Sequence, residues 1–202
     1  VVFRGNSLTH MSAGALSGMR RTEIGYVLQG QNLLQNFTVG ENVCMPAFLG
    51  GMDKDTFNHA RKLLDEFGLG DMEGEMPDSL SGGKQRRVAI ARAFIHHPKL
   101  IIADEPTKGL DAVLRRQVFQ SLKEVSKKSS LLVITHDMFF AKSICDYLFI
   151  FKEGKVIEHG SSKEIFYNPK EEYTKQLLDS IPRKIYKMEY RNERVKQNAS
   201  QC

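Results

Sequence analysis

Apolar and polar residues follow one another along the chain in segments that predict strands and helices in turn. Short runs rich in apolar residues at 24–28, 100–103 and 131–135 predict strands, and the last two are nearly continuous, as in parallel strands covered on both faces. Apolar residues at helical spacing predict helices over residues 12–20, 55–67, 81–96, 111–127 and 137–143. Helices that alternate with buried strands are typical of an α/β protein with a parallel sheet.

Local signals mark where several of these elements begin and end. Thr38–Glu41 and Ser161–Glu164 have the spacing of a capping box, so each predicts the start of a helix. Ser81 predicts a helix N-cap, and Gly68 is expected to end the helix that precedes it. The remaining predictions are a strand at residues 1–4, a loop at residues 77–80, and two strands over residues 146–158 around a turn at residues 153–155.

Charge is distributed unevenly along the 202 residues. The formal net charge is +5, from 29 basic and 24 acidic residues. Residues 183–202 hold six basic and two acidic residues, a net +4, so residues 1–182 are close to neutral. This argues against a generally basic, nucleic-acid-binding protein and assigns the surplus to a tail that is either a solvated extension or a contact with anionic lipid.

Cysteine usage and hydropathy exclude several other classes. The three cysteines are scattered and form no C-x-x-C pair, so neither a disulfide framework nor a zinc site is expected, and a reducing compartment is the simplest interpretation. No apolar run approaches the ~20 residues that span a bilayer. The first residues show no secretory signal pattern.

Two carboxylates, Asp104 and Glu105, directly follow the apolar run at residues 100–103. They are therefore expected at the carboxyl end of a strand, where open α/β sheets bind ligands. Asp104 is suited to hold Mg²⁺, and Glu105 is suited to orient or deprotonate a water that attacks a phosphate. The alternative is that both residues only end a strand and cap the next turn.

Three further positions are suited to phosphate chemistry. The Ser81 hydroxyl and the backbone of Gly82 and Gly83 at a helix start can bind an anion, or can simply form an ordinary capped helix. His136 follows the run at 131–135 and can donate to a phosphate oxygen, although a lone histidine there is more often structural. Gln29 follows the first strand and is either a metal or water contact or a surface glutamine.

Taken together, these segments resemble the ATP-binding cassette (ABC) ATPase family. The pattern LSGG-x-Q-x-R-V-A-I-A-R-A occupies residues 80–93, Asp104–Thr107 follows it, and Gly109–Asp111 matches the family's D-loop. The resemblance covers residues 1 to about 173. It implies an α/β, P-loop NTPase-like, mostly parallel sheet core with an inserted helical subdomain at about residues 38–97, within a nucleotide-binding domain over residues 1–182.

The resemblance also assigns roles to individual residues. In that family two cassettes dimerise head to tail around two ATP molecules, with Mg²⁺ as cofactor. It implies that Ser81, Gly82 and Gly83 bind the γ-phosphate of ATP that is held mainly by the partner cassette, and that Asp111 crosses the dimer interface. It also implies that Asp104 holds Mg²⁺, that Glu105 is the general base, and that His136 braces the γ-phosphate. Gln29 would link the metal site to the membrane subunit.

The sequence departs from the family pattern in two places. Lys84 occupies the fifth signature position, where glutamine is commoner, and this is expected to tune the site without abolishing it. No G-x-x-x-x-G-K-[ST] phosphate loop occurs in the 202 residues. The sequence therefore resembles a cassette whose start is missing, and predicts little or no ATPase activity and weak stability for this chain alone.

Two segments point to different members of the family. Residues 165–182 resemble the end of oligopeptide, dipeptide and nickel importer ATPases, whereas residues 29–46 resemble lipoprotein-releasing and macrolide-type exporters. The importer group is favoured. It implies a second cassette and membrane permeases as direct partners and a solute-binding protein as an indirect partner. It also implies a location at the cytoplasmic face of the plasma (inner) membrane. A soluble cassette protein acting on DNA or ribosomes and a non-catalytic fragment are the alternatives, and the transported solute stays open.

Overall fold

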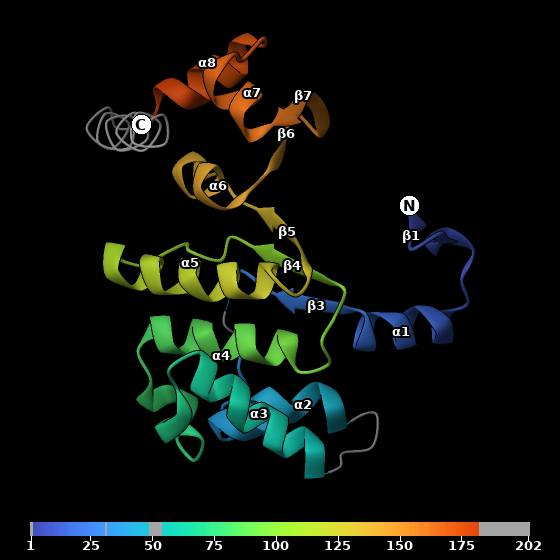
Figure 1. The fold of residues 1–202 in the computed structure, drawn as a ribbon, viewed down its shortest axis with the longest axis vertical. Coiled ribbons are helices and arrows are strands. Elements are labelled where there is room, and N and C mark those ends of the chain that lie inside the picture. Colours follow the sequence, from blue (N-terminus) through green and yellow to red (C-terminus); the bar gives the residue numbers. More distant parts are fainter. Residues whose placement is uncertain (1, 31, 49–53, 182–202) are drawn as a thin grey trace, which may run out of the picture. The chain divides into compact units, whose positions relative to one another are not determined.

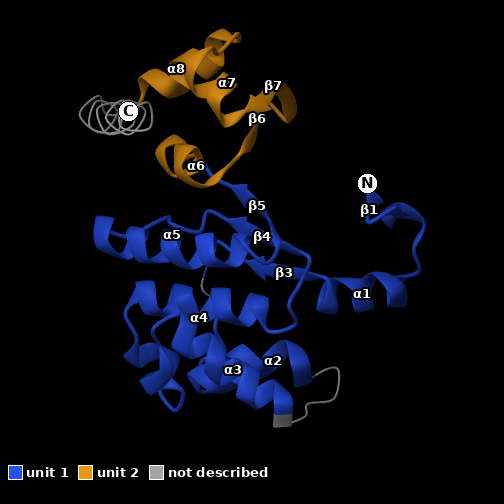
Figure 2. Ribbon diagram, viewed as in Figure 1, with its two compact units in different colours: residues 1–135 blue, residues 136–202 orange. Residues whose placement is uncertain are grey.

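The computed structural model describes residues 2–30, 32–48 and 54–181. Val1 and the predicted basic tail at residues 183–202 lie outside these ranges. The chain divides into two compact units, residues 1–135 and residues 136–202 (Figure 2). No helix within the described ranges is both long and apolar enough to cross a bilayer.

A three-stranded parallel sheet forms the centre of the first unit (Figure 1). Its strands are β3 (Ile24–Val27), β4 (Leu100–Asp104) and β5 (Ser130–Ile134), in the order β3-β4-β5. The register aligns Val27, Ala103 and Val133 in one row. All three strands agree with the segments predicted from the apolar runs, and the parallel pairing confirms the α/β class.

The two faces of this sheet differ in burial. Ile101 and Ala103 of β4 are buried, and Gly25 of β3 approaches the backbone of α4 (Gly82–Phe94) on the same face. On the other face, Leu132 and Ile134 of β5 are 47% and 52% exposed. The prediction that β5 is buried on both faces is wrong, because an apolar run does not encode which elements will cover each face of a strand.

The chain between β3 and β4 is mainly helical. Its helices are α2 (Val39–Phe48), α3 (Lys54–Glu66) and α4, with short 3₁₀ turns at Gly70–Met72 and Pro77–Ser79. The predicted capping box begins α2: the Thr38 hydroxyl accepts a bond from the Glu41 N–H (3.3 Å), and the Glu41 carboxylate accepts one from the Thr38 N–H (2.7 Å). Gly68 follows α3 with φ of +65°, as a helix stop requires.

The predicted loop at residues 77–80 instead contains one of these 3₁₀ turns. Pro77 is its first residue, where the fixed φ of proline favours a helical turn and no N–H is needed. The turn leads directly to Ser81 and the start of α4. The difference from the prediction is small. The segment that leads to the predicted anion-binding residues is thus a 3₁₀ turn.

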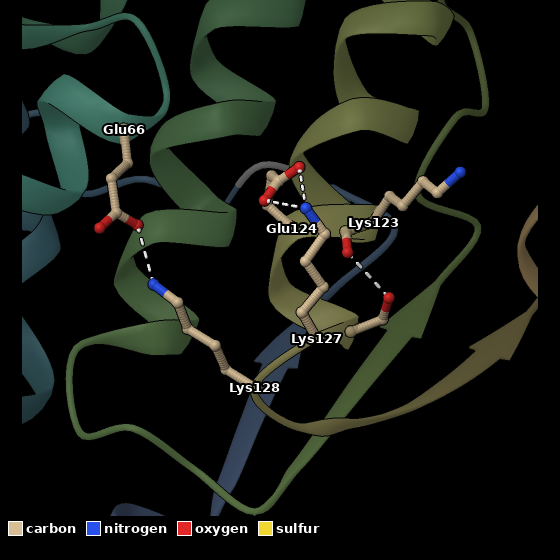
Figure 3. Close-up of polar contacts among 6 residues, drawn as sticks. Glu66, Lys123, Glu124, Lys127 and Lys128 are labelled. Carbon is tan, nitrogen blue, oxygen red and sulfur yellow. Dashed lines mark hydrogen bonds and ion pairs between the residues drawn. The ribbon is translucent and has the colours of Figure 1, made fainter.

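The helix after β4, α5 (Ala112–Ser126), is linked to α3 through its C-terminal end (Figure 3). The Lys128 ammonium lies 3.3 Å from the Glu66 carboxylate, and Lys127 forms an ion pair of 2.7 Å with Glu124. All four side chains are about half exposed or more, so each pair contributes roughly 0–1 kcal/mol. The pairs therefore orient the helix ends without adding much to stability.

The first residues form a hairpin and a helix. Strands β1 (Val2–Phe3) and β2 (Asn6–Ser7) pair antiparallel, a 3₁₀ turn covers Leu8–His10, and α1 covers Ala13–Thr22. The Ser12 side chain caps α1 by accepting a bond of 3.3 Å from the Ala15 N–H. These elements agree with the predicted strand and helix to within about two residues, the usual uncertainty of helix ends.

The second unit contains a hairpin packed against short helices. Its elements are α6 (Met138–Ile144), β6 (Tyr147–Lys152), β7 (Lys155–Ser161), α7 (Ser162–Tyr167) and α8 (Glu172–Asp179). Leu148 and Ile150 of β6 are buried with Ile165 and Phe166 of α7. The two strands, the turn at Gly154 and the capping box that begins α7 all agree with the sequence prediction.

Burial of Cys44 leads to a prediction about thiol reactivity. Cys44 on α2 is 1% exposed, and burial, with the nearby charges of Glu73 and Glu41, raises its pKa to about 11. Because the thiolate is the reactive form, a thiol with a pKa of about 11 has roughly 100-fold less thiolate at pH 8 than an ordinary thiol with a pKa near 9. We expect iodoacetamide to label Cys44 at least tenfold more slowly in the native protein than in urea, with native labelling rising only as the pH approaches 11. Peptide mapping by mass spectrometry measures this, and equal rates in the two states at pH 8 would contradict it.

Candidate functional site

The two predicted carboxylates lie at the carboxyl edge of the parallel sheet. Asp104 is the last residue of β4, and Glu105 follows it with a left-handed backbone (φ +45°), which is uncommon for a residue other than glycine. The Glu105 N–H donates to the carbonyl of Ile134 on β5 (2.8 Å), and the Thr135 hydroxyl donates to the Glu105 carboxylate (3.3 Å). The end of β5 therefore fixes both the backbone and the side chain of Glu105.

Gln29 lies at the same edge. It follows β3 by two residues, and because β3 and β4 are parallel, it leaves the sheet on the same side as Asp104 and Glu105. Its side chain is exposed. The structure thus brings three of the predicted site residues to one edge.

The loop that begins at Gln29 is held by buried polar side chains that sequence reasoning missed. Arg86 on α4 donates to the carbonyls of Leu28 (2.6 Å) and Gln29 (2.7 Å). Asn42 on α2 is fully buried, and its amide bonds the backbone of the same loop farther along. A charged and an amide residue on otherwise apolar helix faces are a sequence signal for such contacts, because buried polar groups are normally hydrogen-bonded.

The predicted signature residues lie at the start of α4. Ser81 is the N-cap, but its hydroxyl makes no capping hydrogen bond, which differs from the expected capping role. Gly83 is buried, and a Cβ there would collide with the side chain of Leu114 in the first turn of α5. Glycine at this position therefore permits the close approach of α4 and α5.

Asp111 caps the helix against which Gly83 packs. Its carboxylate accepts bonds of 2.9 Å from the N–H groups of both Val113 and Leu114. The turn before it contains Gly109 with φ of +74° and a bond of 3.3 Å from the Leu110 N–H to the Thr107 carbonyl. The structure thus places the predicted signature and D-loop residues on the adjoining first turns of two packed helices.

His136 directly follows Thr135 and begins the second unit. The next residue, Asp137, is the N-cap of α6, where its carboxylate accepts a bond of 3.0 Å from the Phe140 N–H. The role of His136 beside a phosphate remains a prediction.

The carboxyl edge fits a magnesium site of one particular kind. Within residues 2–30, 32–48 and 54–181, no group of three or more His, Cys, Asp and Glu side chains gathers to hold a metal ion. Mg²⁺ in phosphoryl-transfer sites usually takes one or two carboxylates, several waters and phosphate oxygens of the substrate. Asp104 therefore fits a site that a nucleotide completes, and the described residues do not form a closed protein cage.

Comparison with known proteins identifies the family of the chain. The family model described as ABC transporter matches residues 1–108. A solved dimeric ATP-binding cassette, MJ0796, in a post-hydrolysis state with ADP and phosphate, superposes with a TM-score of 0.70 at 30% identity, covering 79% of this chain and 72% of that one.

The relatives of this chain include methionine import ATP-binding proteins. The protein MetN of Haemophilus ducreyi is 38% identical over 204 residues, which cover 100% of this chain and 58% of that protein. The MetN of Mannheimia succiniciproducens is 40% identical over 179 residues, which cover 87% of this chain and 52% of that protein. The chain thus spans about half the length of the relatives that it matches.

The parallel sheet with carboxylates at its edge and the helices inserted between β3 and β4 form the α/β fold of a nucleotide-binding domain of the ABC type. The chain belongs to the ABC transporter ATP-binding cassette family.

Proposed function

We propose that this chain is the ATP-binding part of a cassette that drives solute import, and that the solute is methionine or a chemically similar amino acid. The observation that carries the ATPase proposal is the fixed position of Glu105, held by Ile134 and Thr135 beside Asp104. The names of the relatives support methionine as cargo, in place of the peptides or nickel suggested by residues 165–182.

The proposed chemistry is phosphoryl transfer to water. Asp104 would bind Mg²⁺, which supplies charge stabilisation to the phosphate oxygens when bound. Glu105 accepts a proton from the attacking water, and the two contacts from the end of β5 keep its carboxylate in place for this step. Gln29 would contact the metal or the attacking water from the end of the neighbouring strand, and His136 would donate to the γ-phosphate.

The signature residues would act on a second nucleotide. Ser81, Gly82 and Gly83 bind the γ-phosphate of an ATP that a partner cassette holds, and Asp111 lies at the interface between the two cassettes. The Ser81 hydroxyl supports this role, because it makes no capping bond within α4. The proposal also includes a nucleotide-binding domain over residues 1–182 and a tail over residues 183–202. It includes the permease and solute-binding partners and a position at the cytoplasmic face of the plasma (inner) membrane.

A complementation assay tests the proposal. The partner is an intact methionine-import cassette whose own signature serine is replaced by arginine, so that it hydrolyses no ATP alone. This chain, which contains no phosphate loop in its 202 residues, is also expected to be inactive alone. Mixing the two is expected to restore phosphate release, because one composite site then has the partner's phosphate loop and the signature of this chain.

Two variants of this chain sharpen the assay. Ser81→Arg is expected to lower the restored rate at least tenfold, because it blocks the hydrogen-bond donors aimed at the γ-phosphate. Ser17→Arg, on an exposed position of α1, adds the same side chain elsewhere and should leave the rate unchanged. Failure of the mixture to exceed the sum of the separate rates, or equal rates for the two variants, would refute the proposed role.

A further inference from the structure

Arg86 joins two segments that are far apart in the sequence. It lies in the second turn of α4, five residues after Ser81, and it is only 2% exposed. Its two terminal nitrogens donate to the consecutive carbonyls of Leu28 and Gln29, at 2.6 and 2.7 Å. The planar guanidinium thereby fixes both the distance and the orientation of the backbone at the end of β3.

Burial of the Arg86 guanidinium is expected to contribute little to the stability of the fold. No carboxylate among the described residues pairs with Arg86, its Nε has no hydrogen-bond partner, and burial lowers its pKa. Burying a cation without an opposite charge costs free energy, and an apolar side chain of similar volume is often at least as stabilising. The contact therefore has its main value in placing the two carbonyls.

A second arginine of α4 also binds the loop after β3. Arg92 of α4 donates to the carbonyl of Asn32 at 2.7 Å. Both arginines have a pKa lowered by burial, so both guanidinium groups are partly withdrawn from water. Both arginines of α4 thus bind the loop after β3, Arg86 at residues 28 and 29 and Arg92 at residue 32.

We propose that Arg86 is a positioning residue that couples the signature turn, Ser81–Gly83, to the loop after β3, so that Gln29 moves together with α4. The roles of the two coupled segments rest on the proposed function, whereas the coupling itself is a property of this chain. Contact of the signature turn with a nucleotide shifts the start of α4, and the bonds from Arg86 transmit this shift to Gln29, at the same carboxyl edge of the sheet as Asp104 and Glu105.

Hydrogen exchange in the purified chain tests the mechanical part of this proposal. Arg86→Met keeps the apolar stem and removes both donors, so exchange of the amides at residues 28–34 is expected to rise about tenfold, while that of β4 changes less than twofold. Arg86→Lys retains the charge and a donor, and should lie between. Arg116→Met removes an exposed guanidinium from α5 and should leave both segments unchanged.

A double-mutant cycle separates coupling from a merely structural role. A Cβ at residue 83 would collide with the Leu114 side chain, so Gly83→Ala requires that side chain or the start of α4 to shift and perturbs the contact of the signature turn with α5. With Arg86 present, this change is expected to alter exchange at residues 28–34 by at least threefold; with Arg86→Met, the additional change should be less than about half of that. Measuring the cycle with Arg86→Lys gives a second answer if Arg86→Met does not fold.

Several results would overturn the proposal. These are unchanged exchange at residues 28–34 in Arg86→Met, an equal rise in all segments, and the same response to Gly83→Ala with and without Arg86. None of these measurements requires ATP turnover. Failure of the coupling is thus distinct from failure of the complementation assay, which tests the proposed function.

Discussion

Gly25→Ala is expected to lower the free energy of unfolding by more than ~3 kcal/mol, a large fraction of the roughly 5–15 kcal/mol that stabilises a typical native protein. A Cβ at residue 25 would collide with the Ala93 carbonyl of α4 and with the side chain of Ile101 on β4. The Ile101 side chain can change rotamer, but the backbone of Ala93 can yield only if α4 moves off the sheet. Since α4 covers this face, the substitution separates the two main layers of the first unit.

Gly18→Ala is the matched control for this prediction. Gly18 lies within α1, and a Cβ added there meets no atom within 4 Å. Alanine is the better helix former by roughly 0.5–1 kcal/mol, so this variant should be slightly more stable than the parent. Urea denaturation followed by circular dichroism compares the three proteins. An unfolding free energy for Gly25→Ala within 1 kcal/mol of the parent would show that α4 and β3 are less tightly packed than the structure indicates.

Most secondary structure in this chain was predictable because its signals are local. The capping boxes at Thr38–Glu41 and Ser161–Glu164 form with the bonds that their spacing predicts. The three strands appear at the predicted apolar runs, since a short β-branched run has few other ways to bury its side chains. Each of these elements depends on residues that lie close to one another in the sequence.

The burial of β5 was not predictable in the same way. Leu132 and Ile134 belong to a run as apolar as that of β4, yet they are exposed. Which face of a strand is covered depends on where the helices pack, and that is a long-range property. Periodicity therefore predicted the strand, and the structure was needed to show which of its side chains are buried.

The candidate site shows the same division. The position of Asp104 and Glu105 at a strand end follows from the sequence, because four apolar residues precede them. The contact of Glu105 with Thr135 depends on the register of β4 and β5, residues 30 apart in the chain. Arg86 gives a partial signal, since it shares a helical face with Gly83 and Ile90, but the carbonyls that it binds lie 57 and 58 positions away.

Asn42→Ala is expected to destabilise the protein by about 3 kcal/mol. The Asn42 amide is fully buried: its oxygen accepts from the Leu34 N–H (2.8 Å), and its nitrogen donates to the carbonyls of Leu34, Phe37 and Thr38 at 2.9–3.0 Å. Alanine removes all of these bonds. The Leu34 N–H and the Phe37 carbonyl then lose this partner, whereas the Leu34 carbonyl keeps a bond of 3.2 Å from the Phe37 N–H. Each buried group left unsatisfied costs about 1–3 kcal/mol.

Two further variants decide whether hydrogen bonding is the cause. Asn58→Ala, at an exposed position of α3, makes the same chemical change and should alter the unfolding free energy by less than about 0.5 kcal/mol. Asn42→Asp keeps an acceptor for the Leu34 N–H, but it sets a buried carboxylate against the carbonyls to which the amide donated. This variant should therefore be at least as destabilising as alanine near pH 7. At low pH the protonated acid can donate again, so part of the lost stability should return. Urea titrations at two pH values measure these differences. If Asn42→Asp were as stable as the parent at pH 7, the donors of Asn42 would not be what holds the loop after Gln29 against α2.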